Sequence, residues 1–206
     1  ILNQINPRLI YCSLTGYGST GPDSHRKGYD TTTQAMSGLM SVTGQPGGPP
    51  TKAGTPIADT IAASFALSGI LAALYHREST GLGQFVDISM VDTLFSSLFD
   101  DPLDCFEELG LNFQQGNRLV RFSPFNTYKT NDSWIVICCG TDEMWNKLCK
   151  TIDRLDLSKE KNWSRMDGRV THNDKVDDLI SSWTSKFSTK SALKKLENED
   201  IVASPV

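Results

Sequence analysis

The chain has 206 residues, with 20 Lys and Arg against 24 Asp and Glu, and a formal net charge of −4. A mildly acidic chain without a basic stripe argues against nucleic-acid binding, whose affinity depends on phosphate neutralisation. Hydrophobic residues make up 38% of the chain, which suffices for a packed core and argues against disorder.

The first hundred residues alternate between strand-like and helix-like patterns. The β-rich stretch 9–14 predicts a strand, and the glycine-rich stretch 15–22 predicts a loop. The later predicted elements are a helix over 30–42, a loop over 44–54, a helix from Thr55-Pro56 to about Tyr75, a turn over 79–83, a strand over 84–89 and a helix from Met90 to Phe99. The order strand–helix–helix–strand–helix is typical of an α/β domain.

The helix that begins near Thr55-Pro56 is apolar nearly all round, which predicts that it is buried. Threonine suits the N-cap and proline the first helical position. The charge-free stretch between Asp59 and Arg77 contains Ser, Thr and Gly, and is too short and polar to predict a membrane span.

The second half of the chain has a different character. A strand is predicted over 133–139, and helices over 143–152, 173–187 and 190–199. One of these helices carries an apolar stripe that predicts core packing, formed by Val176, Leu179, Ile180 and Trp183. Residues 1–100 hold 5 basic and 7 acidic residues but 12 of the 16 glycines, so the charge-poor and charged halves are expected to form different structural units.

Cysteine and histidine usage excludes some site classes. The cysteine count is odd and no C-x-x-C occurs, which predicts reduced, mostly buried thiols rather than a disulfide framework or a zinc site. The five cysteines are Cys12, Cys105, Cys138, Cys139 and Cys149. The three histidines form no metal-spaced cluster, and G-x-S-x-G is absent. Because the sequence begins at Ile1, it is interpreted as an internal segment of a longer chain.

Asp59 stands out because it follows a Gly- and Pro-rich loop and falls in the first turn of a predicted helix. A carboxylate there faces the positive end of the helix dipole and free backbone N–H groups. An ionised, partly desolvated carboxylate can attack an activated carbonyl. The alternative is that Asp59 only stabilises the helix start, and physical reasoning alone favours that alternative.

Lys27-Gly28-Tyr29-Asp30 is a second candidate group. A lysine beside a flexible glycine can meet a phosphate, and Tyr29 offers a flat face and a hydroxyl. The alternative is that Tyr29 and Asp30 simply begin a helix, with Asp30 as its cap. Gly116-Asn117-Arg118 is a third candidate loop, although an arginine in such a loop is usually exposed to solvent.

These stretches together resemble the family III CoA-transferases, the group that includes formyl-CoA transferase and α-methylacyl-CoA racemase. The resemblance covers nearly the whole chain, and its order and spacing are specific. It is carried by Asn6-Pro7-Arg8-Leu9-Ile10-Tyr11, Thr15-Gly16-Tyr17-Gly18, Gly21-Pro22, Gly28-Tyr29-Asp30, Gln34-Ala35-Met36-Ser37-Gly38-Leu39-Met40, Gly44-Gln45-Pro46-Gly47-Gly48-Pro49-Pro50, Ile57-Ala58-Asp59, Thr80-Gly81-Leu82-Gly83-Gln84, Gly116-Asn117-Arg118 and the stretch from Gly168-Arg169-Val170 to Pro205-Val206.

The resemblance implies an α/β fold in an interlocked homodimer. Residues 1–115 would be the C-terminal part of a Rossmann-like, CoA-binding large domain with its linker, and residues 116–206 an incomplete small α/β domain. The resemblance also implies an acyl-CoA and a small carboxylic acid as substrates, no permanently bound cofactor and no metal. The mildly acidic charge and the polar residues within the apolar stretch predict no nucleic-acid and no membrane partner. The reduced thiols indicate a cytoplasmic location, or the mitochondrial matrix in a eukaryotic source.

Site residues follow from the same resemblance. The catalytic aspartate of the family falls on Asp59, which would form a mixed anhydride and then an aspartyl-CoA thioester. The CoA-contacting run falls on Lys27, Gly28, Tyr29 and Asp30, with Lys27 near a CoA phosphate and Tyr29 near the thioester. Met90 matches a further position that lines the CoA site, and this match is looser.

Tyr29 separates the branches of the family. The racemases hold a histidine there that exchanges a proton at the carbon beside the thioester, whereas a tyrosine, whose ordinary pKa is about 10, is a weak base at neutral pH. Tyr29 therefore favours a transferase over a 2-methylacyl-CoA epimerase. A third interpretation is a CoA-binding or dimerisation fragment without activity.

Two departures from the family pattern stand out. Residues 118–126 lack the glycine run that closes over the active site in the formyl-CoA enzyme, which weakens the case for the oxalate–formate substrate pair. An upstream segment with further CoA contacts is missing from this sequence, so the fragment alone is expected to bind CoA poorly.

Overall fold

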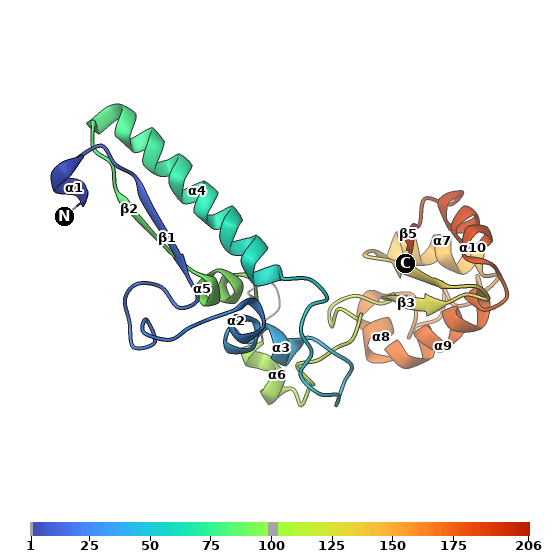
Figure 1. The fold of residues 1–206 in the computed structure, drawn as a ribbon. Helices are drawn as coiled ribbons and strands as arrows, with labels where there is room; N and C mark the ends of the chain where they lie inside the picture. The colour runs from blue at the N-terminus through green and yellow to red at the C-terminus, as the bar shows by residue number, and fades with distance from the viewer. Residues whose placement is uncertain (1, 99–102) are drawn as a thin grey trace. The chain divides into compact units, whose positions relative to one another are not determined.

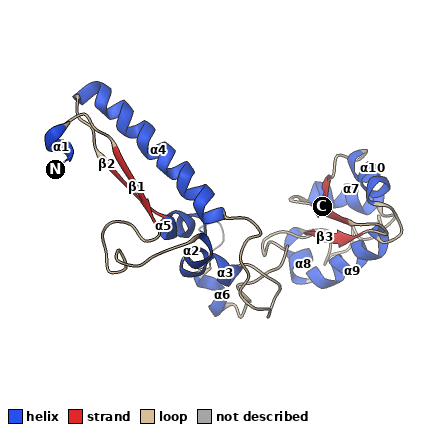
Figure 2. Ribbon diagram, in the orientation of Figure 1, coloured by secondary structure: helices blue, strands red, loops and turns tan. Residues whose placement is uncertain are grey.

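The computed structural model describes residues 2–98 and 103–206. The chain is a mixture of helices and strands, as the sequence predicts (Figure 2). It divides into two compact units, Ile1–Gly116 and Asn117–Val206, each with its own sheet (Figure 1).

The first unit is built on a two-stranded parallel sheet. Strand β1 (Tyr11–Thr15) pairs with β2 (Phe85–Ser89) along their full lengths. Parallel strands need a long crossover connection, and α4 lies in it and packs along both strands. The helices of this unit are α1 (Leu2–Ile5), α2 (Asp30–Met36), α3 (Leu39–Val42), α4 (Ile57–Thr80), α5 (Met90–Phe95), the 3₁₀ turn η1 (Ser96–Leu98) and α6 (Asp104–Glu108).

Two predicted helices of this unit have different bounds in the structure. The helix predicted over 30–42 is divided into α2 and α3 by Gly38, whose φ of 91° lies in the left-handed region that favours glycine. The helix predicted from Met90 to Phe99 is found as α5 followed by η1, and Phe99 lies outside the described residues.

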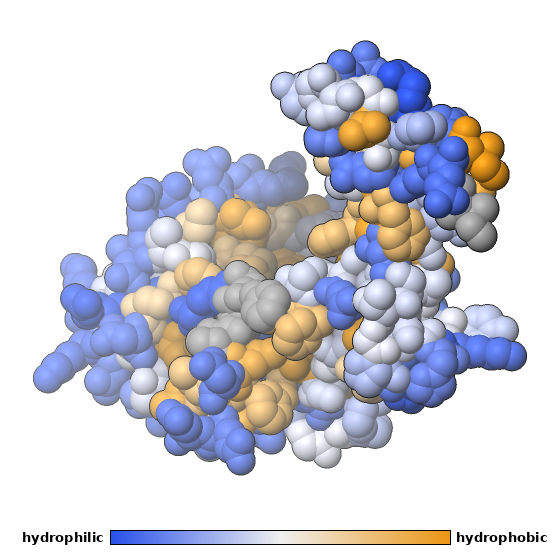
Figure 3. Space-filling model, turned by 90° about the vertical axis from the view of Figure 1, so that its left-hand side faces the viewer, coloured by the Kyte–Doolittle hydropathy of each residue, from blue (hydrophilic) through white to orange (hydrophobic). Residues whose placement is uncertain are grey.

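Helix α4 is present, but the prediction that it is buried was wrong. Ala58, Ala62 and Ala73 are buried, whereas Leu67, Leu71 and Tyr75 are 59%, 56% and 83% exposed. Packing by β1, β2, α2 and α5 buries only this alanine side of the helix within the described chain. Apolar side chains consequently reach the surface of this unit, as in the view of Figure 3.

The start and the length of α4 also differ from the prediction. Pro56, rather than Thr55, occupies the N-cap position, and the helix continues to Thr80 before Gly81 ends it. Alone among the helices described, α4 is long and apolar enough to cross a membrane, by length and composition only, and the sequence did not predict a span there. A core helix of a soluble protein satisfies the same criterion.

The second unit contains an antiparallel sheet in the order β3–β4–β5. The strand and three helices that the sequence predicts are found as β4, α7, α9 and α10, while β3, β5 and α8 were not predicted. The elements are β3 (Phe125–Lys129), β4 (Trp134–Cys138), α7 (Asp142–Thr151), α8 (Met166–Thr171), α9 (Asn173–Thr184), α10 (Thr189–Glu197) and β5 (Val202–Pro205).

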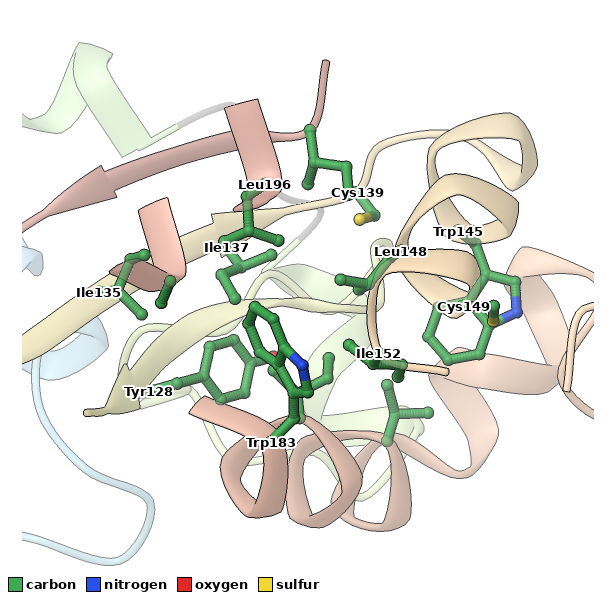
Figure 4. Packing of buried hydrophobic residues seen from close by; sticks show 14 of the residues in the cluster. Tyr128, Ile135, Ile137, Cys139, Trp145, Leu148, Cys149, Ile152, Trp183 and Leu196 are labelled. Carbon is green, nitrogen blue, oxygen red and sulfur yellow. The ribbon is translucent and has the colours of Figure 1, made fainter. Parts of the chain in front are cut away.

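The core of the second unit lies between its sheet and its helices (Figure 4). Ile135 and Ile137 of β4 are fully buried, and so are Trp145 and Leu148 of α7. The predicted stripe on α9 is confirmed, because its members all belong to or pack against this core: Val176, Leu179, Ile180 and Trp183.

The five cysteines are free thiols. Cys139 and Cys149 are buried in the core of the second unit, where burial raises the pKa of each thiol to about 12. The other three, Cys12, Cys105 and Cys138, are half-buried, so the expectation of mostly buried thiols holds only in part.

Candidate active site

The residues predicted to carry chemistry gather at one end of the parallel sheet. The register aligns Thr15 with Ser89, so both strands end at the same edge. Figure 1 shows α2, α5 and the start of α4 at that end. Ligands of parallel α/β sheets bind outside the carboxyl ends of the strands, so this edge is the candidate site.

Asp59 lies in the first turn of α4, as predicted, and its side chain is exposed. No hydrogen bond or ion pair within residues 2–98 and 103–206 involves the Asp59 carboxylate. The positive end of the helix dipole attracts negative charge at this position. Asp59 is therefore a carboxylate that a ligand can approach without displacing a partner.

Asp30 is engaged inside the protein rather than free. Its Oδ1 accepts a hydrogen bond of 2.8 Å from the backbone N–H of Ala58, the residue before Asp59. Its Oδ2 accepts a bond of 2.6 Å from Gln34 Nε2, and Gln34 Oε1 accepts one of 2.9 Å from the Ala53 N–H. The Asp30 carboxylate thus ties the first turn of α2 to the first turn of α4.

Lys27 and Tyr29 are available to a ligand. The Tyr29 side chain is 82% exposed and Lys27 is exposed as well. Only the backbone of Tyr29 is bound locally, where its carbonyl accepts from the Thr32 hydroxyl and its N–H donates to the same hydroxyl oxygen. This turn fixes the start of α2 and leaves the phenol ring free.

Met90 does not lie on the surface of the site. It is the first residue of α5 and only 5% exposed. Its side chain packs in a small core with Ala58, Ala62 and Leu94. The structure therefore places Met90 in the core that contains Ala58, the residue before Asp59, rather than on the surface of the site.

Gly28 allows two segments of the site to touch. A Cβ on Gly28 would stand 2.9 Å from the Cα of Gly16, the residue that follows β1, and 3.1 Å from Thr33 Cγ2. Real Cβ atoms do not approach backbone so closely. The absence of a side chain at Gly28 therefore places the Lys27–Asp30 run directly against the carboxyl end of β1.

We expect Gly28→Ala to destabilise the first unit by about 1–3 kcal/mol, the usual cost of overpacking. The Val91 amide reports the local effect, because it donates to the carbonyl of Gly16. Its hydrogen exchange should accelerate in Gly28→Ala but not in Gly54→Ala, since a Cβ at Gly54 meets nothing within 4 Å. Equal exchange rates in the two variants would contradict this account of the close approach.

Some supporting residues were not identified from the sequence. Gln34 is fully buried, and its spacing of four residues from Asp30 on a helix was the one local signal. Asp87 on β2 accepts hydrogen bonds from the N–H and hydroxyl of Ser19, which order the glycine-rich loop after β1. No local pattern marks that pair, because the two residues are far apart in the sequence.

The Gly116-Asn117-Arg118 loop lies where the two units meet in sequence. Arg118 belongs to the second unit, where Nη2 stands 2.8 Å from Asp174 and 2.7 Å from Asp177. Burial opposes the charge of Arg118, but hydrogen bonds to the two carboxylates prevail and raise its pKa. The Arg118 guanidinium is thus held within its own unit.

Within the ranges 2–98 and 103–206, no group of three or more His, Cys, Asp or Glu side chains is placed to hold a metal ion.

Comparison with known proteins identifies one family over the whole chain. The family described as "CoA-transferase family III" matches residues 1–206. Acetyl-CoA:oxalate CoA-transferase of Acetobacter aceti is 40% identical over 187 residues, covering 90% of this chain and 48% of that enzyme. Succinate–glutarate CoA-transferase of Agrobacterium fabrum is 33% identical over 205 residues, covering 100% of this chain and 51% of that enzyme.

Solved structures give the same result for the fold. The crystal structure of a CAIB/BAIF family protein from Brucella suis matches with a TM-score of 0.82 and 31% identity. The match covers 100% of this chain and 54% of that protein. The chain spans about half the length of the relatives it matches.

Proposed function

The chain belongs to CoA-transferase family III, and we propose on that premise that the protein moves CoA from an acyl-CoA donor to a carboxylic acid, with Asp59 as the nucleophile. The family match and the solved structures confirm the family resemblance and the α/β fold class expected from the sequence. The observation that supports the role of Asp59 is its exposed carboxylate, which has no partner among the described residues, in the first turn of α4 at the carboxyl end of a parallel sheet.

The proposed reaction exchanges acyl groups without consuming water or a net proton. A carboxylate oxygen of Asp59 attacks the thioester carbonyl and expels CoA thiolate, which leaves a mixed anhydride. The thiolate then attacks the Asp59 carbonyl, releases the donor acid and forms an aspartyl-CoA thioester. The acceptor carboxylate attacks this thioester, and the thiolate expelled in that step takes the new acyl group, which regenerates Asp59.

The residues around Asp59 suit this proposal to different degrees. Lys27 would meet a CoA phosphate and Tyr29 the thioester region, and both are exposed. Gly28 would keep the binding run against the end of β1. Met90 would contribute only as the packed base of the site, because it is buried.

The wider assembly is part of the same proposal. Ile1–Gly116 would be part of the CoA-binding large domain and Asn117–Val206 the small domain of an interlocked homodimer. We propose a cytoplasmic enzyme, or a mitochondrial one in a eukaryotic source, that uses CoA thioesters as substrates and holds no permanent cofactor. The named relatives act on oxalate, succinate and glutarate, so small dicarboxylic acids are the first acceptors to test.

Trapping of the covalent intermediate tests the proposal. The native protein that carries this chain is mixed with an acyl-CoA and a panel of small dicarboxylic acids, then quenched with hydroxylamine or borohydride. We expect new acyl-CoA in the mixture and, by mass spectrometry, modification of the peptide that contains Asp59.

Three outcomes would contradict the proposal. Transfer with modification at another residue would exclude Asp59 as the nucleophile. Solvent deuterium at the α-carbon without transfer would indicate an epimerase. Association without turnover for every donor and acid would indicate a CoA-binding or dimerisation role.

A further inference from the structure

We propose that Asp30 and Gln34 are positioning residues that fix the first turn of α4 and thereby the place of Asp59. The inference rests on the proposed nucleophilic role of Asp59, and it assigns to Asp30 a task inside the protein instead of contact with CoA.

The proposal starts from a chain of three hydrogen bonds. The Ala53 N–H donates to Gln34 Oε1 at 2.9 Å, Gln34 Nε2 donates to Asp30 Oδ2 at 2.6 Å, and the Ala58 N–H donates to Asp30 Oδ1 at 2.8 Å. Ala53 and Ala58 lie 19 and 28 residues from their partners in the sequence. These three hydrogen bonds therefore join α2, the loop that precedes α4, and α4 itself.

Burial gives this chain of bonds a fixed direction. Gln34 is 0% exposed, and a buried amide needs both its oxygen and its nitrogen satisfied. The oxygen must face the Ala53 N–H, which leaves the nitrogen to face a carboxylate. Turning the Gln34 amide over would place its NH₂ against an N–H and its oxygen against the Asp30 carboxylate.

Asp30 supplies a cap that α4 lacks. The N-cap position of α4 holds Pro56, which makes no side-chain cap hydrogen bond. The Ala58 N–H is one of the donors that a helix start leaves unpaired, and an Asp30 carboxylate oxygen accepts it next to the positive end of the helix dipole.

The hydrogen bond to the Ala58 N–H is one residue away from Asp59 along the backbone. Ala58 is 0% exposed and directly precedes Asp59, so a shift of the Ala58 amide moves the Asp59 backbone. A displacement of about 1 Å in a reacting group can cost roughly 10²-fold in rate. Loss of the chain of hydrogen bonds should therefore lower kcat more than it raises KM for the acyl-CoA.

A reciprocal exchange tests this proposal. Asp30→Asn places a new NH₂ group opposite the NH₂ group of Gln34. Gln34→Glu places a new carboxylate opposite the carboxylate of Asp30. The Asp30→Asn/Gln34→Glu double variant restores an acceptor for each backbone N–H, reverses the direction of the central bond and keeps the net charge.

In the native protein that carries this chain, we expect each single variant to lower kcat by about 10- to 100-fold, with little change in KM. The double variant should return to within about threefold of the native kcat. The same exchanges at exposed positions of the first unit, Gln4→Glu and Asp104→Asn, should leave kcat unchanged.

A second readout is independent of activity. Hydrogen exchange at the Ala53 and Ala58 amides should accelerate in each single variant and slow again in the double variant. Because this readout does not involve Asp59, a failure of the nucleophile proposal would leave it interpretable. A double variant that remains as impaired as the single variants, or that fails to fold, would overturn the proposal. A double variant with restored amide protection but without activity would also overturn it, because it would indicate that the Asp30 carboxylate itself contacts substrate.

Discussion

Asp59→Asn is expected to lower kcat for CoA transfer by about 10³-fold or more, the scale of loss when a nucleophile is removed. The asparagine side chain has the same size and suits the first turn of a helix, but it has no anionic oxygen to attack a thioester. The fold should be kept, because no interaction of the Asp59 side chain within the described residues would be lost. Transfer of CoA from a labelled acyl-CoA to a small dicarboxylic acid measures the effect.

Glu78→Gln is the matched control for Asp59→Asn. Glu78 is an exposed carboxylate on the same helix, 19 residues further along, or about 28 Å at 1.5 Å per residue. Removing its charge changes the net charge of the protein as Asp59→Asn does, but at the end of α4 away from the candidate site. Similar kcat values for the two variants would show that position on the helix does not matter and would exclude Asp59 as nucleophile.

Local patterns predict the order of elements in the first unit well. The β-rich run that became β1 lies between Pro7 and Gly16, and the run that became β2 follows Gly83. The apolar run between them is long enough for a helix. The break at Gly38 was missed because an isolated glycine is compatible with a continuous helical pattern. Its φ of 91° shows that the chain turns there.

The exposed face of α4 shows what a local pattern does not contain. An apolar residue on every side predicts burial, but burial depends on which other elements cover the helix. The two strands and two helices packed against α4 cover its alanine side and leave Leu67, Leu71 and Tyr75 exposed.

The strands missed in the second unit have a related cause. Phe125–Lys129 includes Asn, Thr and Lys, and Val202–Pro205 ends in proline, so neither run has a strong strand signal. Both form because β4 offers a pairing edge on each side. Proline is tolerated in β5 because β5 is an edge strand.

In the candidate site too, local sequence patterns predict some features and not others. The first-turn position of Asp59 followed from the adjoining loop and apolar run. The bonds from Ala53 to Gln34 and from Ala58 to Asp30 did not follow, because each joins segments that only the folded chain brings together.

A buried arginine holds three segments of the second unit together. Arg169 on α8 is 0% exposed. Its Nε donates to the Ser123 carbonyl at 2.8 Å, Nη1 to the Trp163 carbonyl at 2.9 Å and Nη2 to Asp142 Oδ1 at 2.9 Å. The guanidinium also lies 5.1 Å from the centre of the Trp145 ring.

Arg169→Met is expected to lower the free energy of unfolding of the second unit by about 3 kcal/mol or more, because it leaves the buried Ser123 carbonyl and the partly buried Trp163 carbonyl without this donor and breaks the ion pair with Asp142. All four tryptophans lie in Asn117–Val206, so tryptophan fluorescence during denaturation reports this unit alone. Arg165→Met is the control, since Arg165 is 78% exposed and loses only its 3.4 Å ion pair with Asp167. Equal free energies of unfolding for the two variants would show that the Arg169 hydrogen bonds contribute nothing beyond an ordinary surface ion pair. A lower free energy of unfolding for Arg169→Met than for Arg165→Met is the result expected if the Arg169 guanidinium organises the core around Trp145.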